Sequence, residues 1–296
     1  MILLTGGTGQ VGRSILVHPH AQDLSLVAPS RKDLDLSDAS SIERVLKSRN
    51  FTAIIHAGAY TAVDQAESEP ALADAVNAKA PALLARFCQE RAIPIVHFST
   101  DYVFSGEACA PYHEEDATSP LGVYGATKRA GEQAVLASRC RAVILRTAWV
   151  VSPYGKNFIK TMLRLAQERE EIRVVADQCG CPTGAPDLAA VVISILPRLL
   201  AVPEVPTGLY HCCNQGETTW AGLARAVMNE SARLGGPTAK IVEIGTADYP
   251  TPAQRPKNSR LSCEKLQHDW GITMRPWQNA VAENVAALLY EKGHAS

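Results

Sequence analysis

Short apolar runs recur along the first half of the chain, separated by longer stretches that mix apolar and polar residues. Runs of this length are too short for buried helices and are typical of strands buried on both faces of a parallel sheet. The longer stretches, such as residues 71–91, have the spacing of helices that pack on a sheet. This alternation predicts an α/β fold with a doubly wound parallel sheet of the Rossmann type. The apolar runs occupy residues 1–5, 24–28, 53–59, 93–100 and 142–148.

After residue 149 the pattern loosens. Residues 157–168 and 185–200 have the amphipathic spacing of helices. Two further apolar runs, at about 172–176 and 208–213, are short enough for strands. Because they resemble the strands of the N-terminal half, we expect both to return to the Rossmann sheet.

The length of 296 residues allows one two-lobed unit or two domains with a large buried core. We expect a dinucleotide-binding Rossmann domain over residues 1–150. We expect residues 151–296 to form a smaller substrate-binding lobe that covers the crevice of the first domain. No internal repeat or low-complexity linker marks any other boundary.

Composition and charge exclude several classes of partner. The net charge of -1 and the sequence pI near 6.7 give no electrostatic basis for binding nucleic acid or an anionic membrane. No apolar run approaches the roughly 20 residues that span a bilayer. The N-terminus lacks the basic region of a signal peptide, so we expect a cytoplasmic protein.

The eight cysteines do not have the spacing of a structural zinc site. The close pairs are Cys179-Gly-Cys181 and the adjacent Cys212-Cys213, and neither forms part of a repeated Cys-x-x-Cys pattern. The others fall within apolar or helical stretches. We expect reduced, structural thiols and no metal site.

A glycine-rich segment, Gly-Gly-Thr-Gly-Gln-Val-Gly at residues 6–12, directly follows the first predicted strand. Its glycines match either Gly7-x-Gly9-x-x-Gly12 or Gly6-x-x-Gly9-x-x-Gly12, and a helical stretch follows from about Arg13. Glycine lets the backbone turn tightly and approach a pyrophosphate, and the helix N-terminus adds N–H groups and a positive dipole end. A glycine triplet alone is a weak signal. In the order strand, glycine turn and helix, it predicts a dinucleotide site.

The second predicted strand runs into Pro29-Ser30-Arg31. A site that prefers NAD places an acidic residue near this point, on the ribose hydroxyls. An arginine suits a 2′-phosphate instead, so we expect NADPH to be preferred, with NADH as the other candidate. The alternative is that Arg31 is a solvated loop residue without a role. Asp35 is better placed to lie beside the adenine.

Two later strands end in residues suited to a ligand site. The small residues Ala-Gly-Ala at 57–59 allow backbone to approach a ligand. The strand at 93–100 delivers Ser99, Thr100 and Asp101 to the same edge, because ligands bind beyond the carboxyl ends of the strands in open α/β sheets. Thr100 is therefore a candidate for a hydrogen bond to a substrate oxygen, unless it is an ordinary strand residue.

Tyr124 and Lys128 are four residues apart in a predicted helix and therefore share one face. A nearby ammonium favours the phenolate, so we expect Lys128 to lower the pKa of Tyr124. Tyrosine tuned in this way exchanges a proton with a substrate oxygen. Taken alone, Tyr-x-x-x-Lys is a weak pattern, and an ordinary helix surface explains it better.

Several longer motifs are more specific than the glycine turn. The order of glycine turn, Ser99-Thr100-Asp101 and Tyr124-x-x-x-Lys128 resembles the extended short-chain dehydrogenase/reductase family. Within it, nearly the whole chain resembles the dTDP-4-dehydrorhamnose reductases. The motifs that carry this resemblance are residues 9–12, 60–67, 99–104, 146–149, 157–158, 177–178, 182–183 and 255–261.

The resemblance implies reduction of the C4 ketone of dTDP-4-dehydro-β-L-rhamnose by NAD(P)H, the last step of dTDP-L-rhamnose synthesis. It implies that Tyr124 protonates the oxyanion, Lys128 holds the nicotinamide ribose and Thr100 orients the carbonyl. The expected cofactor-binding residues are Gly6, Thr8, Gly9, Gln10, Val11, Gly12, Ser30, Arg31, Asp35, Leu36, Ala57, Gly58, Ala59, Tyr60, Asn77, Ser99, Tyr124 and Lys128. The expected substrate-binding residues are Val63, Thr100, Asp101, Tyr102, Trp149, Asn157 and Arg255.

Two of the substrate assignments also have a basis in side-chain chemistry. The Arg255 guanidinium suits the diphosphate of a nucleotide sugar because it binds phosphate oxygens in a fork. Trp149 suits a sugar pocket, although core packing explains an aromatic residue at that position equally well.

The chain departs from the family at one point. Some relatives are dimers bridged by magnesium through glutamates, and the matching positions here are Ser14 and Pro186. We therefore expect no bridging metal and either a monomer or a homodimer.

Two other functions fit part of the pattern. The regulatory β subunit of methionine adenosyltransferase shares this fold and several motifs, and it binds NADP and a partner enzyme without turning over a sugar. A reductase of another nucleotide 4-keto sugar is the second alternative, because uracil and thymine differ by one methyl group. The intact Thr100, Tyr124 and Lys128 favour a reductase.

Overall fold

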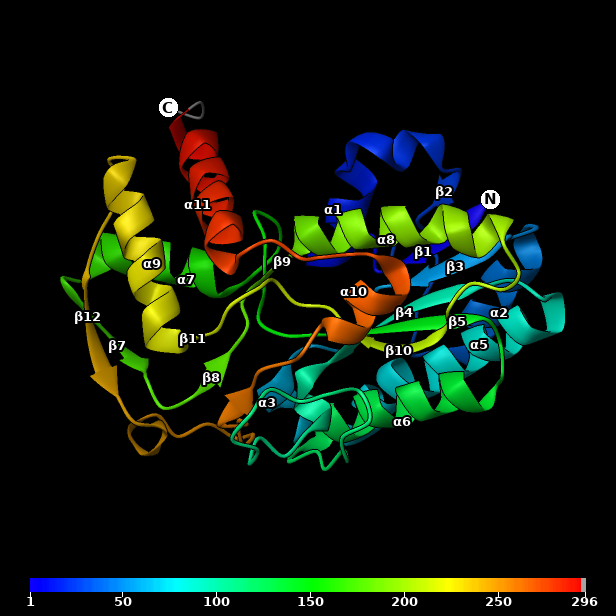
Figure 1. Ribbon diagram of the computed structural model, residues 1–296, viewed down its shortest axis with the longest axis horizontal. Helices are drawn as coiled ribbons and strands as arrows, with labels where there is room; N and C mark the ends of the chain where they lie inside the picture. Colours follow the sequence, from blue (N-terminus) through cyan, green and yellow to red (C-terminus); the bar gives the residue numbers. More distant parts are fainter. Residues whose placement is uncertain (294–296) are drawn as a thin grey trace.

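The computed structural model describes residues 1–293 and has a larger and a smaller lobe (Figure 1). The larger lobe is built on a six-stranded parallel sheet with the order β10-β5-β4-β3-β1-β2. The predicted doubly wound parallel sheet is confirmed. Its strands are β1 (Ile2–Thr5), β2 (Leu26–Val27), β3 (Ala53–His56), β4 (Ile95–Thr100), β5 (Ala142–Thr147) and β10 (Gly208–His211).

Alternate residues of β1 send their side chains to opposite faces of the sheet. Leu3 joins the hydrophobic core on one face, and Ile2 and Leu4 join the core on the other. The helices that pack on the Leu3 face are α2 (Ala39–Ser48), α5 (Ala80–Arg91) and α6 (Val123–Ala137). Those on the opposite face are α1 (Gln10–Val17), α8 (Ala185–Ala201) and α10 (Glu264–Trp270).

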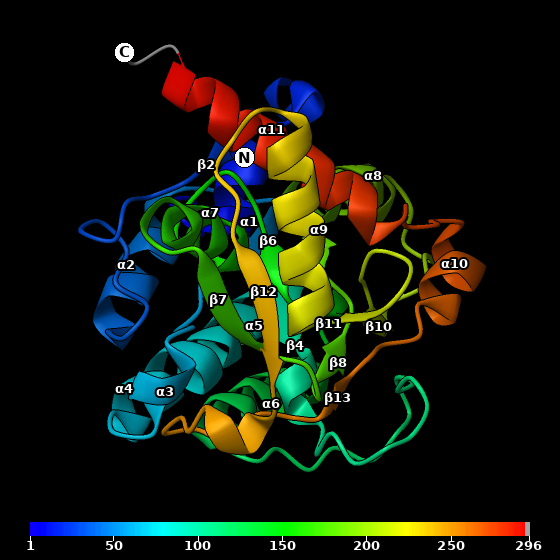
Figure 2. The ribbon, with the colours of Figure 1, turned by 90° about the vertical axis from the view of Figure 1, so that its left-hand side faces the viewer.

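The expectation that residues 172–176 return to the large sheet is wrong. They form β7 (Glu171–Val175), which pairs with β12 (Lys240–Ile244) in a separate two-stranded sheet of the smaller lobe. Figure 2 shows this pair with its helices in front of the large sheet. The side chains of Glu171 and Arg173 are exposed, so β7 alternates, unlike the fully buried strands of the large sheet. The helices around it are α7 (Phe158–Glu168), α9 (Trp220–Arg233) and α11 (Trp277–Gly293).

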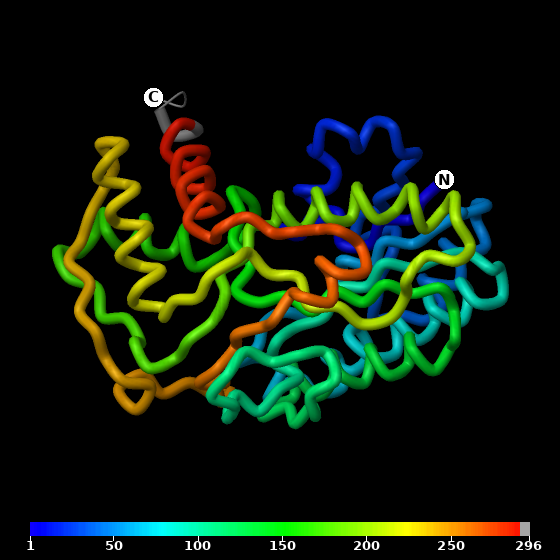
Figure 3. Tube along the Cα trace, viewed as in Figure 1, coloured from blue at the N-terminus to red at the C-terminus, as the bar shows by residue number. Residues whose placement is uncertain are grey.

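The chain passes between the two lobes repeatedly, as its trace in Figure 3 shows. β10, α8 and α10 all follow residue 150 and yet belong to the larger lobe. Short strands lie where the chain crosses. They are β6 (Val150–Val151) paired with β9 (Thr183–Gly184), and β8 (Cys179–Gly180) paired with β11 (Thr218–Thr219) and β13 (Asn258–Ser259).

The segment before α5 contains a turn of π-helix at Ala75–Lys79, between α4 (Pro70–Asp74) and α5. The sequence predicts a helix over about residues 71–91 that is broken or bent near Pro81, and the π-helical turn interrupts the helix just before this residue. Pro81 lies in the first turn of α5, where its missing N–H is not needed. The remaining elements are α3 (Val63–Ala66) and 3₁₀ turns at Pro19–Asp23, Asp101–Val103 and Thr246–Asp248. Within residues 1–293, no helix is both long and apolar enough to cross a membrane.

Candidate active site

A cavity of about 510 Å³ lies beyond the carboxyl ends of β1 and β3. The strand order reverses between these two strands, which is where open α/β sheets bind their ligands. The expected cofactor residues that line it are Gly6, Thr8, Gly9, Gln10, Val11, Arg31, Asp35, Leu36, Ala57, Gly58, Ala59, Tyr60, Ser99, Tyr124 and Lys128.

Other lining residues were missed by sequence reasoning. Most are neighbours of residues that were predicted. Val150 lies in β6, and Gly155 and Lys156 lie in the loop after it, a segment that only the fold brings to the cavity. Nothing in their sequence marks them as ligand residues. The missed residues are Thr5, Gly7, Pro29, Leu34, Thr61, Val76, Phe98, Thr147, Val150, Gly155 and Lys156.

The glycine turn makes the floor of the cavity out of backbone. Gly6 has a φ of 73°, and a Cβ there would lie 2.5 Å from the Gly58 nitrogen. A Cβ on Gly12 would lie 2.2 Å from the Gly6 carbonyl oxygen. α1 begins at Gln10, directly after Gly9. The first turn of the helix therefore lies closer to the glycines than the sequence predicted. A cradle that any side chain would fill fits a pyrophosphate.

Three expected cofactor residues do not line the cavity. Gly12 is buried behind the turn, and Ser30 lies on the exposed loop with its hydroxyl 2.6 Å from Asp33 Oδ2. Asn77 acts through its neighbours. Its Oδ1 accepts from the Tyr60 N–H at 2.8 Å, and its Nδ2 donates to Thr127 Oγ1 at 3.2 Å. The π-helical turn thus holds the Tyr60 loop against α6.

Arg31 and Asp35 lie at the end of the cavity where the sequence places the adenosine half. Arg31 is exposed on the rim. The Asp35 carboxylate accepts hydrogen bonds from the N–H and hydroxyl of Ser37, and these hydrogen bonds lower its pKa. The charge of Arg31 also lowers the pKa of Asp35, so the arginine and the carboxylate lie near each other at this end of the cavity.

Tyr124 lines the cavity, whereas the expected catalytic residue Thr100 is buried beside it and does not line the cavity. Their hydroxyls are hydrogen-bonded, and Thr100 Oγ1 is also 2.9 Å from Asp101 Oδ1. Burial raises the pKa of Tyr124 to about 12, and the Thr100 hydroxyl opposes this rise. The pKa thus moves in the opposite direction from the lowering predicted for a neighbouring Lys128. At neutral pH, Tyr124 carries its proton.

Lys128 lies one helical turn beyond Tyr124 and is buried. Its Nζ donates to the Phe98 carbonyl oxygen at 2.6 Å. Burial lowers the pKa of Lys128 to about 8, and Glu132 opposes the change. Glu132 itself forms a buried bidentate pair with Arg146, with both contacts at 2.8 Å. Lys128 is therefore a buried cation with a single carbonyl partner at the cavity wall.

Two glycines let α6 approach closely enough to place these side chains. A Cβ on Gly125 would lie 2.1 Å from the Tyr102 carbonyl oxygen, and one on Gly131 would lie 2.2 Å from that of Asn77. Gly122, before the helix, has no side chain to cap it. The Glu67 carboxylate accepts from the Val123 N–H at 2.8 Å and serves as the cap.

Tyr102, Arg255 and the start of α3 form a group beside Tyr124. The rings of Tyr102 and Tyr124 meet edge to face with centroids 5.5 Å apart. Arg255 Nη2 is 2.8 Å from Asp64 Oδ2, and the guanidinium lies 6.0 Å from the Tyr102 ring centroid. Arg255 Nη1 is buried and has no hydrogen-bond partner among the described residues. Val63, adjacent to Asp64, begins α3.

The other expected substrate residues are engaged within the protein. Asp101 is buried, and burial raises its pKa to about 6. Trp149 stacks on Trp220 with centroids 3.6 Å apart. The Asn157 side chain caps α7, because its Oδ1 accepts a hydrogen bond from the Lys160 N–H. Its Nδ2 donates to Gln10 Oε1 at 3.1 Å. The structure thus places Asn157 against the glycine turn rather than beside Tyr102.

A buried histidine pair behind the cavity was not expected. His56 on β3 and His97 on β4 stack with ring centroids 5.0 Å apart, and burial lowers the pKa of His56 to about 3. His56 Nδ1 lies 2.6 Å from Thr5 Oγ1, which accepts from the Gly58 N–H at 3.2 Å. The neutral pair thereby supports the backbone at the end of β3.

The chain is similar to known proteins over almost its full length. Residues 1–290 match the family model described as RmlD substrate binding domain. The chain is 40% identical over 291 residues to dTDP-4-dehydrorhamnose reductase of Sinorhizobium fredii, covering 98% of each. It is 42% identical over 285 residues to the Escherichia coli K12 protein of that name, covering 95% of each.

A solved structure shows the same similarity. This is the crystal structure of dTDP-4-dehydrorhamnose reductase from Bacillus anthracis in complex with NADP. It has a TM-score of 0.88 and 32% sequence identity, and the match covers 97% of this chain and 98% of that one. The similarity therefore includes both lobes.

Proposed function

The chain belongs to the dTDP-4-dehydrorhamnose reductase family, and from that premise we propose that it reduces the C4 ketone of dTDP-4-dehydro-β-L-rhamnose to dTDP-L-rhamnose. The observation that carries the proposal is that Tyr124 and Lys128 both line the cofactor cavity, with the buried Thr100 hydroxyl hydrogen-bonded to that of Tyr124. This places a proton donor where a dinucleotide and a second ligand would meet.

The cavity supports NADPH as the cofactor, with NADH as the second candidate. The backbone cradle at Gly6 and Gly9 leaves room for a pyrophosphate, and Arg31 on the rim suits a 2′-phosphate. The Ser99 hydroxyl is buried at the wall without a hydrogen-bond partner among the described residues, so it is free for a ligand. When bound, the reduced nicotinamide supplies the hydride for the ketone carbon.

Tyr124 is the general acid in this proposal. Hydride addition leaves negative charge on the sugar oxygen, and an acid must quench it in the transition state. The raised pKa of Tyr124, about 12, keeps the proton on the phenol at neutral pH until that charge develops. In this proposal Thr100 turns its hydroxyl proton from Asp101 Oδ1 to the same sugar oxygen, and the hydrogen bond orients the carbonyl for Tyr124.

Lys128 binds the nicotinamide ribose in this proposal. Its ammonium is held at the cavity wall by the Phe98 carbonyl, which leaves two of its three donors for hydroxyls of a ligand. A cation near the cofactor also favours any negative charge that develops on Tyr124 as it loses its proton.

The group formed by Val63, Tyr102 and Arg255 is the proposed sugar-nucleotide side. The unpartnered Nη1 of Arg255 is the donor best suited to a phosphate oxygen, because a guanidinium binds phosphate in a fork. Asp101 supports this side through Thr100. Trp149 is stacked on Trp220, and Asn157 is hydrogen-bonded to Gln10. To contact substrate, each side chain must share its present partner with the substrate or give that partner up.

The same family membership supports a cytoplasmic enzyme of nucleotide-sugar metabolism, acting as a monomer or homodimer. No metal takes part in the proposed reaction.

The test is a panel of nucleotide 4-keto sugars offered with NADPH and with NADH, followed by the absorbance of the reduced nicotinamide. We expect the highest kcat/KM for dTDP-4-dehydro-β-L-rhamnose with NADPH. A higher kcat/KM for a uridine-linked sugar would identify a different reductase. No turnover of any keto sugar, together with recovery of a methionine adenosyltransferase in a pull-down, would replace the proposal with a regulatory subunit.

A further inference from the structure

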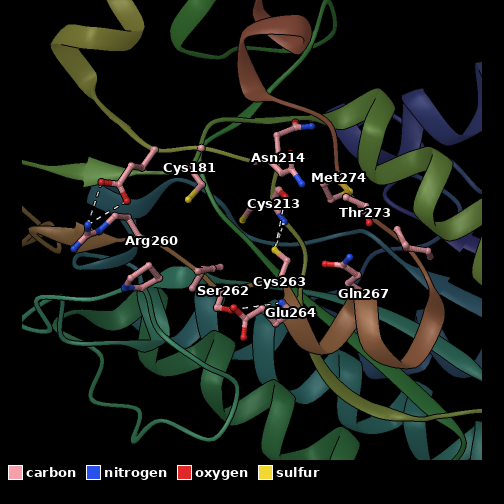
Figure 4. A pocket seen from close by; sticks show the side chains of 16 residues that line it. Cys181, Cys213, Asn214, Arg260, Ser262, Cys263, Glu264, Gln267, Thr273 and Met274 are labelled. Atoms are coloured by element: carbon pink, nitrogen blue, oxygen red, sulfur yellow. Dashed lines mark hydrogen bonds and ion pairs between the residues drawn. The ribbon is translucent and has the colours of Figure 1, made fainter.

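A second cleft, of about 290 Å³, lies between the two lobes and shares no lining residue with the cofactor cavity. Figure 4 shows three thiols in its wall, from segments far apart in the sequence. Cys181 follows β8, Cys213 lies shortly after β10, and Cys263 immediately precedes α10. The proposed reduction uses none of them.

Two of these thiols are in direct contact. The Cys213 backbone N–H donates to Cys263 Sγ at 3.2 Å, the contact drawn in Figure 4. Cys263 Sγ also lies 3.7 Å from the Cys213 carbonyl oxygen. The fold therefore holds the Cys263 sulfur against the backbone of Cys213, a cysteine that is 50 residues away in the chain.

We propose that Cys263 and Cys213 form a thiol oxidation site, in which Cys263 reacts with a peroxide and Cys213 then closes a disulfide with it. In the first step the Cys263 thiolate attacks one peroxide oxygen. A sulfur–oxygen bond forms and the oxygen–oxygen bond breaks. The other peroxide oxygen leaves and takes up a proton, which gives water or an alcohol. Sulfur is oxidised by two electrons to the sulfenic acid, and the peroxide is reduced by two.

In the second step Cys213 attacks the sulfur of the sulfenic acid. The sulfur–sulfur bond forms and the sulfur–oxygen bond breaks, and the hydroxide leaves as water with the proton from Cys213. A thiol reductant returns both residues to their starting state. The inference is independent of the proposed reductase activity.

Exposure and hydrogen bonding assign the first step to Cys263. Cys263 is half-buried and lines the cleft, whereas the exposed fraction of Cys213 is 1%. The hydrogen bond from the Cys213 side chain lowers the pKa of Cys263, while burial and Glu114 oppose the change. Burial raises the pKa of Cys213 well above the usual value, so Cys213 stays protonated until a sulfenic acid forms beside it.

The test is a peptide map of the full chain after treatment with hydrogen peroxide in small excess, followed by alkylation of the remaining thiols. We expect a cross-linked peptide pair containing Cys213 and Cys263, lighter by two hydrogens and split by dithiothreitol. In Cys213→Ser, dimedone should instead label Cys263 as its sulfenic acid. In Cys263→Ser, Cys213 should remain reduced.

Cys109→Ser is the matched control, because Cys109 is the cysteine with the exposed side chain and has no part in the contact. The cross-link should form in it as in the wild type. Wild-type protein in which Cys213 stays reduced while Cys263 is oxidised would overturn the proposal, as would a cross-link of either residue to Cys181. The wild-type map decides the question even if a serine variant does not fold.

Discussion

The cavity proposed for the cofactor and the side proposed for the substrate meet at Tyr124, but the first is formed largely by backbone and the second by side chains. The floor of the cofactor cavity is backbone, and neither Gly6 on the floor nor Gly12 behind it has room for a Cβ. The substrate side consists of side chains that hold one another, such as Arg255 with Asp64, which are 191 residues apart in the chain. Trp149 and Trp220 form a similar long-range pair.

This difference means that the two regions respond to different kinds of change. A backbone cradle is formed before any ligand arrives, so a substitution disturbs it through shape. A side chain that already has a partner must share or exchange that partner when substrate binds, so a substitution acts through charge and hydrogen bonding. Cofactor affinity and substrate affinity should therefore be separable by mutation.

Tyr124→Phe tests the point where the two regions meet. Removal of the hydroxyl keeps the ring packed but removes the acid, and proton transfer from a placed side chain contributes roughly 10²- to 10⁴-fold. We expect kcat to fall by that order, with little change in the Kd for NADPH measured by fluorescence titration. Tyr112→Phe, which removes a hydroxyl outside both regions, should keep full kcat. Near-normal turnover of Tyr124→Phe would remove Tyr124 from the mechanism.

Lys128 should make the stability of the cofactor side depend on pH. Its pKa is about 8 in the folded protein and 10.5 in an ordinary environment. Between these values the unfolded chain holds a proton that the folded protein has released, so the free energy of unfolding should rise with pH across this window. The gain relative to Lys128→Met should reach roughly 3 kcal/mol.

Urea unfolding of both proteins without cofactor, from pH 7 to pH 10.5, measures this difference. Groups other than Lys128 titrate in both proteins and cancel. Parallel pH profiles for wild type and variant would show that Lys128 is not perturbed by burial.

Gly12→Ala tests the backbone cradle. The new Cβ would lie 2.2 Å from the Gly6 carbonyl oxygen, and overpacking of this kind costs about 1–3 kcal/mol. We expect a lower melting temperature and a weaker Kd for NADPH, measured by calorimetry. Gly245→Ala is the matched control, because the nearest atom to its new Cβ is 3.7 Å away. Unchanged NADPH affinity in Gly12→Ala would show that the turn is not the pyrophosphate site.

Arg255→Ala tests the substrate side. A hydrogen bond to a charged group contributes about 1.5–3 kcal/mol, so the KM for the nucleotide sugar should rise about tenfold or more. The Kd for NADPH should not change, because Arg255 does not line the cofactor cavity. Arg225→Ala, which removes an exposed arginine paired with Glu243, should leave KM unaltered. Equal losses of cofactor and substrate affinity in Arg255→Ala would contradict the separation of the two regions.

Arg31→Ala should have the smallest effect. Arg31 is exposed, and ion pairs at exposed positions contribute about 0.2–1 kcal/mol, which corresponds to at most roughly fivefold in affinity. The ratio of the NADH and NADPH dissociation constants should narrow by that amount, and Lys32→Ala should leave it unchanged. Equal affinities of the wild type for NADPH and NADH would show that Arg31 is a loop residue with no role in cofactor selection.

Local patterns in the sequence were sufficient for the parts of the molecule that short-range geometry controls. The buried runs of the N-terminal half predicted the parallel strands, and the spacing of Tyr124 and Lys128 put both on one face of α6. The glycines at 6–12 predicted a backbone cradle, although α1 begins at Gln10 rather than a few residues later. Each of these features follows from the period of a strand or helix, or from the absence of a Cβ.

Features that depend on distant partners were decided by the tertiary structure. β7 pairs with β12 and not with a strand of the large sheet. Asn157 caps α7 and is hydrogen-bonded to Gln10. The pKa of Tyr124 rises because the fold buries the ring, while the Lys128 ammonium turns to the Phe98 carbonyl. Burial and the choice of hydrogen-bond partner depend on which segments pack together, and a local pattern carries no information about those segments.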